Sequence, residues 1–180
     1  MLPPAKSYDD LIDRFSWKIP ERYNLGVDVC DKWAKSEPER LAIIDLTGDQ
    51  RRDFSFEELK KRSDQMAVYL LDLGIEQGDR VGVFLTQSIW TAVAHIAIWK
   101  IGAISIPLFK LFGEAALKSR LQDSGAKVVL TDDEGLNILS ALDGLPSLAS
   151  IVVAERIPPQ DTNNFIPLET NADDPAVLIY

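Results

Sequence analysis

The chain has 180 residues, which is enough for one domain with a single buried core. Hydrophobic residues make up 46% of it and charged residues 26%, as is ordinary for a soluble globular protein. The formal net charge is −9, and the lysines and arginines are scattered along the sequence. This disfavours a nucleic-acid partner, because neutralising phosphates requires a clustered basic surface.

The single cysteine and the N-terminal sequence bear on the compartment. Cys30 cannot form an internal disulfide, so a reducing compartment is expected, most simply the cytoplasm. The N-terminus lacks the charged-then-apolar pattern of a secretion signal. The most apolar stretch, Ile89 to Ile101, is too short to span a bilayer, so no membrane span is expected.

The first part of the chain is predicted to hold an arm, a helix and a β-hairpin. Residues 1–24 form the arm, which contains a short helix near Tyr8–Phe15. A second helix runs from about Leu25 to Lys35. The hairpin consists of strands at Leu41–Asp45 and Arg51–Phe54, with a turn at Thr47–Gln50 between them.

A helix is predicted after the hairpin from its start and stop signals. Ser55 and Glu58 form a capping box, in which each side chain accepts a hydrogen bond from the other residue's backbone N–H. Phe54 and Leu59 are spaced for the accompanying hydrophobic contact. Gly74 is expected to end this helix.

The rest of the sequence repeats a strand-then-helix pattern. Apolar runs begin near Arg80, Ala103, Lys127, Ser150 and Ala176, at intervals of about two dozen residues, long enough for the crossovers that parallel strands need. Helical patterns lie between them at Ser88–Ile101, Glu114–Asp123 and Glu134–Leu142. The predicted fold class is α/β: a mostly parallel sheet with βαβ crossovers, preceded by a helix and a β-hairpin.

The end of the chain is predicted to be a buried strand. Asp173-Asp174-Pro175 leads into the apolar run Ala176–Tyr180, with a polar surface loop before it that carries a short strand at Phe165–Leu168. Ligands of open α/β sheets sit in the loops after the strands, and the loop after Tyr180 would be such a loop. We therefore expect an incomplete N-terminal subdomain of a larger fold.

Familiar catalytic motifs are missing from the sequence. No Gly-x-Gly-x-x-Gly follows a strand, no phosphate loop of the Gly-x4-Gly-Lys-Ser/Thr type is present, and one His with one Cys disfavours zinc. His95 lies in an apolar helical stretch, so a packed, hydrogen-bonded core histidine is a better interpretation than a catalytic base. Cys30 is interpreted as a small buried hydrophobe.

Two loops remain as candidates for chemistry. Asp132-Asp133-Glu134 follows a predicted strand; the pattern fits a helix N-cap better than a metal site. Phe109-Lys110-Leu111-Phe112-Gly113 follows the strand Ala103–Leu108. Its aromatic rings could stack on a base while the ammonium attracts phosphate. The alternative is a turn whose aromatic rings pack on the sheet edge, which the pattern taken alone favours.

The order of several short segments resembles the AMP-forming acyl-CoA synthetases of the adenylate-forming superfamily. These segments are Leu25-Gly26, Cys30–Ala34, Leu41–Asp45, Phe54–Leu59, Leu73–Ile75, Gly78–Val81, Lys100–Ile104, Asp123–Lys127 and Asp173–Tyr180. The resemblance implies an enzyme that joins a small carboxylic acid to ATP, with Mg²⁺, and then transfers the acyl group from AMP to CoA. Short- and medium-chain acyl-CoA synthetases look most similar.

The resemblance also assigns parts of the chain. Residues 25–180 would be the N-terminal part of the AMP-binding domain, ending before the phosphate loop that follows the residue matching Tyr180. Phe109, Lys110 and Leu111 resemble the turn that contacts CoA, although related acetyl-CoA synthetases have a glycine pair where Lys110 and Leu111 stand. The 180-residue piece alone is expected to be inactive and to self-associate as a homo-oligomer.

Two alternatives stay open at this point. One is another branch of the same superfamily, an adenylation domain that loads a carrier protein instead of CoA. The other is a free-standing flavodoxin-like binding module without catalysis.

Overall fold

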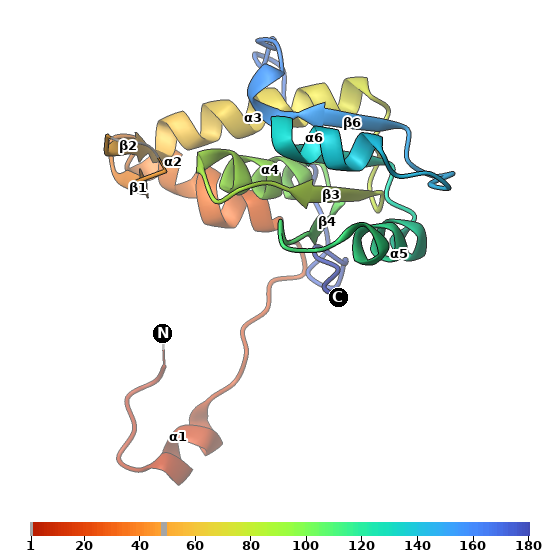
Figure 1. Ribbon diagram of the computed structural model, residues 1–180. Helices are drawn as coiled ribbons and strands as arrows, with labels where there is room; N and C mark the ends of the chain where they lie inside the picture. Colours follow the sequence, from red (N-terminus) through yellow and green to blue (C-terminus); the bar gives the residue numbers. More distant parts are fainter. Residues whose placement is uncertain (1, 48–49) are drawn as a thin grey trace.

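Four parallel strands form the central sheet, in the order β4-β3-β5-β6 (Figure 1). Their bounds are Arg80–Phe84 for β3, Ile104–Pro107 for β4, Val128–Thr131 for β5 and Ser150–Val153 for β6. Each neighbouring pair is in parallel register. The computed structural model thus confirms the predicted α/β class and four of the five predicted strands. It describes residues 2–47 and 50–180, so the middle of the predicted turn at 47–50 lies outside the described residues.

A two-stranded antiparallel sheet precedes the central sheet, as predicted. It pairs β1 (Leu41–Asp45) with β2 (Arg52–Ser55). Before it, Val27–Asp31 forms a π-helical turn that continues into α2 (Lys32–Ser36). The sequence predicts one regular helix here, and a π-turn is a local widening that apolar spacing does not reveal.

The long helices lie where the sequence places them. Their bounds are Phe56–Asp72 for α3, Ile89–Lys100 for α4, Glu114–Ser124 for α5 and Asp133–Ser140 for α6, with a short 3-10 turn at Ala154–Arg156. The capping box of Ser55 and Glu58 is present at the start of α3. Gly74, whose φ is +80°, follows the end of α3 in the left-handed conformation that glycine adopts without strain.

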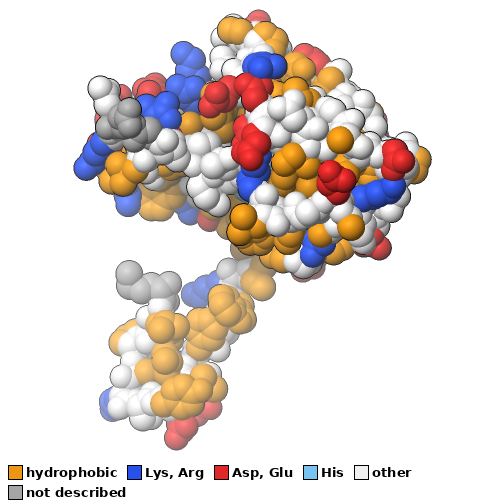
Figure 2. Space-filling view, in the orientation of Figure 1, with side chains coloured by type: hydrophobic (Ala, Val, Ile, Leu, Met, Phe, Trp, Pro, Cys, Tyr) orange, Lys and Arg blue, Asp and Glu red, His pale blue; other side chains and the backbone are white. Residues whose placement is uncertain are grey.

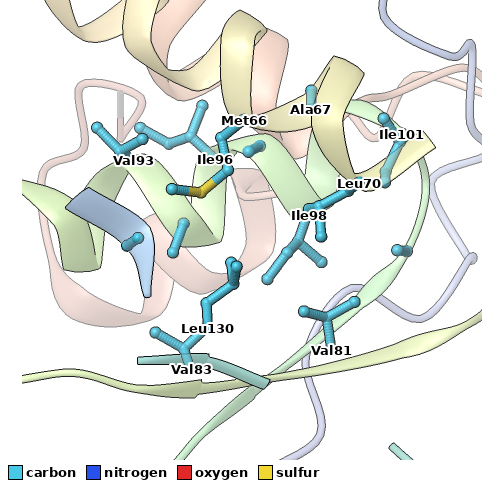
Figure 3. Close-up of a cluster of buried hydrophobic side chains, with 14 of the residues drawn as sticks. Met66, Ala67, Leu70, Val81, Val83, Val93, Ile96, Ile98, Ile101 and Leu130 are labelled. Atoms are coloured by element: carbon cyan, nitrogen blue, oxygen red, sulfur yellow. The ribbon is translucent and has the colours of Figure 1, made fainter. Parts of the chain in front are cut away.

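The sheet separates two clusters of buried side chains. The larger one joins α3 and α4 to one face of the sheet, and Figure 3 shows Met66, Leu70 and Ile98 directed towards Val81 and Leu130. The smaller one joins α5 and α6 to the other face through Phe84, Ile106, Leu117 and Leu139. Burial of strands on both faces explains their nearly continuous apolar sequences.

The prediction that the terminal segment is a buried strand is wrong. The segment makes one parallel bridge, between Ser105 and Val177, and its four last side chains are exposed. Tyr180 donates a hydrogen bond from its hydroxyl to Asp123 on α5, at 2.6 Å. Only β4 pairs with this segment among the described residues, so its apolar side chains lack a second layer to pack against.

The prediction of a short strand at Phe165–Leu168 is also wrong. This segment is irregular, and the Leu168 N–H donates to the Lys100 carbonyl at the end of α4, at 2.7 Å. Pro167 has no N–H to offer a strand partner. The backbone therefore satisfies its hydrogen bonds against a helix end instead of a sheet.

The N-terminal arm extends away from the body of the molecule (Figure 1). It contains α1 (Tyr8–Arg14), close to the predicted Tyr8–Phe15. Hydrophobic side chains gather along it (Figure 2), among them the exposed Ile12, Trp17 and Ile19. Within the described residues, none of the helices has the length and apolar composition that crossing a bilayer requires.

Candidate functional site

The loops that follow β3, β4 and β5 meet at one end of the sheet. β3 lies between β4 and β5, and the chain visits β4 before it crosses to β5. In doubly wound sheets of this strand order, ligands bind beyond the carboxyl ends of the strands where the order reverses. Here Thr86 follows β3, Lys110 follows β4 and Asp132 follows β5, and both Thr86 and Lys110 donate hydrogen bonds to Asp132.

Asp132 is the centre of this network. Its carboxylate caps α6 by accepting from the Gly135 N–H at 2.8 Å, which confirms the N-cap interpretation. It also accepts from the Thr86 N–H at 3.1 Å and the Thr86 hydroxyl at 2.8 Å. Burial alone would raise the pKa of Asp132, but the Lys110 ammonium and these donors outweigh it and hold the pKa well below its usual range.

Lys110 turns its side chain inward. Its Nζ lies 2.7 Å from Asp132 Oδ1, 3.5 Å from Glu134 Oε2 and 4.7 Å from the centre of the Phe84 ring. Only 17% of its side chain is exposed. The sequence suggests a cation free to attract phosphate, whereas the structure places the ammonium between two carboxylates and an aromatic face.

Gly135 makes room for this arrangement. A Cβ atom at Gly135 would lie 2.0 Å from Thr131 Oγ1, 2.9 Å from the Phe84 ring and 3.2 Å from Lys110 Nζ. The first two contacts are shorter than real Cβ atoms show, so any side chain here would displace Thr131 or the Phe84 ring and would crowd the ammonium.

The neighbours of Lys110 face outward. Phe109 is 66% exposed and Leu111 is 96% exposed, unusually open for large apolar side chains. Phe112 packs edge-to-face on Phe109, with ring centroids 5.6 Å apart, and contacts the cluster beneath α5. The two interpretations of the loop from sequence therefore each hold in part. The Phe112 ring packs on the fold, as in a plain turn, and the Phe109 ring is exposed to solvent.

A pocket of about 380 Å³ opens beside this loop. Strand residues of β3 and β4 form its apolar walls, and Thr86, Gln87, Thr91 and His95 supply its polar groups. Phe109, Lys110 and Leu111 border it. The structure thus brings the predicted loop next to His95, which the sequence gives no reason to place there.

His95 differs from the predicted hydrogen-bonded core histidine. Its ring is half-buried and stacks on Trp99, with centroids 5.6 Å apart, and its Nδ1 has no hydrogen-bond partner in the described structure. Burial lowers the pKa of His95, so the neutral form is favoured at pH 7. The prediction of a hydrogen-bonded histidine was wrong: Thr91, the polar side chain one turn earlier in α4, donates to the Thr86 carbonyl instead.

Cys30 is fully buried, as predicted. Burial is the largest effect on its thiol and raises the pKa to about 11. Such a thiol is a poor nucleophile, because the thiolate is the reactive form.

A second ionic cluster, which the sequence does not reveal, lies away from this site. Lys100 is fully buried at the end of α4, and its Nζ donates to Asp64 at 2.6 Å and Ser63 at 2.9 Å. Asp31 Oδ1 lies at 2.6 Å as an ionic contact outside hydrogen-bond geometry. The only sequence signal is a lysine in a helix that is apolar nearly all round, since a buried ammonium requires partners.

Carboxylate groups of the described residues do not assemble into a metal site. Across residues 2–47 and 50–180, no three His, Cys, Asp or Glu side chains converge in a way that could hold an ion.

Comparison with known proteins places the chain in context. Residues 30–180 match the family of AMP-binding enzymes. An acetyl-coenzyme A synthetase of the gamma-proteobacterium EBAC31A08 is 29% identical, over 83% of this chain and 25% of its own length. An acetyl-coenzyme A synthetase 2 of Kluyveromyces lactis is 28% identical, over 92% of this chain and 28% of its own. The chain therefore spans about a quarter of the length of these relatives.

Solved structures share the fold. The crystal structure of a Brucella canis acyl-CoA synthetase superposes with a TM-score of 0.81 at 25% identity, covering 96% of this chain and 35% of that one. The match includes nearly all of the present chain and corresponds to a portion of a longer protein.

Proposed function

Because this chain belongs to the family of AMP-binding enzymes, we propose that it is the N-terminal part of an ATP- and CoA-dependent acyl ligase. Residues 1–24 are its N-terminal arm, and residues 25–180 are the first part of its adenylation domain. Such a ligase joins a small carboxylic acid to the α-phosphate of ATP and releases pyrophosphate. The CoA thiol then attacks the acyl carbon, forms the thioester and releases AMP.

The displayed loop after β4 is the observation that carries the proposal for this chain's own residues. Phe109 and Leu111 are exposed beside a pocket at the carboxyl ends of the strands, where ligands of such sheets bind. The same turn resembles the family's CoA contact. We assign Phe109, Lys110 and Leu111 to contact with the nucleotide part of CoA.

The ATP phosphates and Mg²⁺ are assigned to other parts of the ligase. Within the described residues, no three His, Cys, Asp or Glu side chains converge on a position that could hold an ion. The chain by itself is accordingly expected to be inactive, because phosphate chemistry depends on positioned charge. Pyrophosphate exchange above background by the 180-residue chain would contradict this expectation.

The relatives favour CoA over a carrier protein as the acyl acceptor. Both relatives named above carry the name acetyl-coenzyme A synthetase. The fold does not decide the question, since it also matches a structure of a nonribosomal peptide synthetase with a TM-score of 0.77 at 21% identity. CoA-dependent AMP release by the complete enzyme would support the ligase, and AMP release that needs a carrier protein would contradict it.

A free-standing flavodoxin-like module is the weaker candidate. The strand order would suit it, but the family match extends over residues 30–180. Sequencing the coding region past Tyr180 separates the two. A Thr/Ser/Gly-rich phosphate loop directly after Tyr180 is the expected result, and a stop codon there would favour the module. Cys30, the only cysteine, is consistent with a reducing compartment such as the cytoplasm.

A further inference from the structure

The ammonium of Lys110 is held inside the protein, where Asp132 accepts one of its three N–H donors. It contacts Asp132 at 2.7 Å, Glu134 at 3.5 Å and the face of the Phe84 ring, and most of its side chain is buried. A lysine that binds phosphate from solvent must present its ammonium to solvent, and only 17% of the Lys110 side chain is exposed. If the ammonium left Asp132 to reach a phosphate, that carboxylate would lose its only cationic hydrogen-bond partner among the described residues.

The same contact fixes the path of the loop. Lys110 joins the loop after β4 to Asp132 after β5, and Asp132 is bonded in turn to Thr86 after β3. With the Lys110 side chain turned inward, the side chains on either side of it, Phe109 and Leu111, lie in solvent.

We infer that Lys110 is a positioning residue and not a phosphate ligand, and that the surface it presents is apolar. In this arrangement, which presupposes the proposed function, the ring of Phe109 and the side chain of Leu111 contact the flat base of CoA. An aromatic face stacks on any base and gains from excluding water, without a charged partner. Lys110 contributes by holding the loop in the shape that displays both side chains.

Asp132→Asn separates positioning from phosphate binding by the sign of its effect. Asparagine caps a helix about as well as aspartate, so α6 should remain intact. If Lys110 positions the loop, weakening its partner raises the Michaelis constant for CoA. If Lys110 binds phosphate, releasing it from Asp132 lowers that constant. The measurement is the CoA Michaelis constant of the complete ligase, with thermal unfolding as the control for folding.

Four further variants, at Lys110, Phe109 and Leu111, complete the experiment. We expect Lys110→Ala to raise the CoA Michaelis constant on the order of tenfold, and Lys110→Arg, which can still reach Asp132, to restore most of the loss. The effect of Lys110→Ala should not shrink as salt is added, because a buried pair is screened little, whereas a solvent-facing phosphate contact is screened strongly. Phe109→Ala should raise the same constant.

The outcomes distinguish the two proposals. A lower Michaelis constant in Asp132→Asn, or a Lys110→Ala effect that disappears at high salt, would overturn the positioning role while leaving the CoA site in place. If Phe109→Ala and Leu111→Ala both leave the constant unchanged, the loop does not contact CoA and the proposed site itself fails. If Lys110→Ala fails to fold, the direction in which Asp132→Asn changes the CoA Michaelis constant still decides between the two roles.

Discussion

Lys100 and Asp64 form an ion pair in the interior, with 2.6 Å between Nζ and Oδ1 and the lysine side chain fully buried. The pair joins the end of α4 to the middle of α3. Asp31 contacts the same ammonium and connects the π-helical turn at Val27–Asp31 to this pair. Gly26 permits this approach: a Cβ there would lie 2.8 Å from the Ile96 carbonyl oxygen and 2.9 Å from the Lys100 side chain. The cluster therefore fixes three helices on one face of the sheet.

Removing the lysine should destabilise the fold strongly. Lys100→Met leaves Asp31 without a cation and Asp64 with Lys60 alone, and losing one partner of a buried pair costs about 3–5 kcal/mol. Urea unfolding followed by circular dichroism measures this. Lys60→Ala is the matched control, because Lys60 pairs with the same Asp64 but is more exposed, and should cost less than about 1 kcal/mol. Equal effects of the two variants would contradict this account.

Gly135→Ala tests the packing beneath Lys110. The added methyl group would meet Thr131 and Phe84 at distances that force one of them to move, which costs about 1–3 kcal/mol. The free energy of unfolding gives the result. Gly113→Ala is the control, since a Cβ there meets nothing within 4 Å, and its cost should stay below about 1 kcal/mol. A neutral Gly135→Ala variant would mean that the site is looser than described.

His95 should make stability depend on pH as the pH falls below about 7, the range in which an unperturbed histidine takes up its proton. Its pKa in the folded protein is lowered by burial, so the unfolded chain binds the proton more readily. Stability therefore falls as pH drops through the unfolded value and levels off below the folded one. Because His95 is the only histidine, His95→Gln should flatten the profile in this window, while losses below about pH 4, which come from carboxylates, remain. An unchanged slope in His95→Gln would contradict this prediction.

Cys30 should resist modification until the protein unfolds. With its pKa raised to about 11, the thiol carries little thiolate at pH 8, and burial also blocks access. We expect a disulfide reagent to label it at least about a hundredfold more slowly in the native chain than in urea. Mass spectrometry should find one label per unfolded chain and none in Cys30→Ala. Fast labelling of the native protein would show that the π-helical turn at Val27–Asp31 separates readily from α3.

The isolated chain should self-associate. Its arm exposes Trp17 and Ile19, and the segment paired with β4 exposes Ile179, so apolar groups and an incomplete sheet edge face water together. Light scattering should give at least the mass of a dimer. The double variant Trp17→Ser/Ile19→Ser should lower the measured mass towards that of the monomer. Leu71→Ser, at an exposed position on α3, should leave the mass unchanged. A clean monomer for the unmodified chain would refute the expectation.

Local signals in the sequence determined most of the element order. The capping box at Ser55 and Glu58, the stop at Gly74 and the spacing of apolar runs each involve residues close in the chain, so their consequences can be predicted without the fold. The failures at Phe165–Leu168 and at the terminal segment share one cause. Short apolar runs become strands only if a partner strand and a second layer are present, and both are tertiary conditions.

The partners of charged side chains were decided by the tertiary structure alone. Lys110 and Asp132 are 22 residues apart in sequence, and Lys100 and Asp64 are 36 apart. A lysine's sequence neighbours do not tell whether its ammonium faces water or a buried carboxylate. The sequence by itself determined an α/β chain with a loop after β4 that resembles a CoA contact. Only the folding of three loops onto Asp132 decided that Lys110 turns inward and that Phe109 and Leu111 face the solvent.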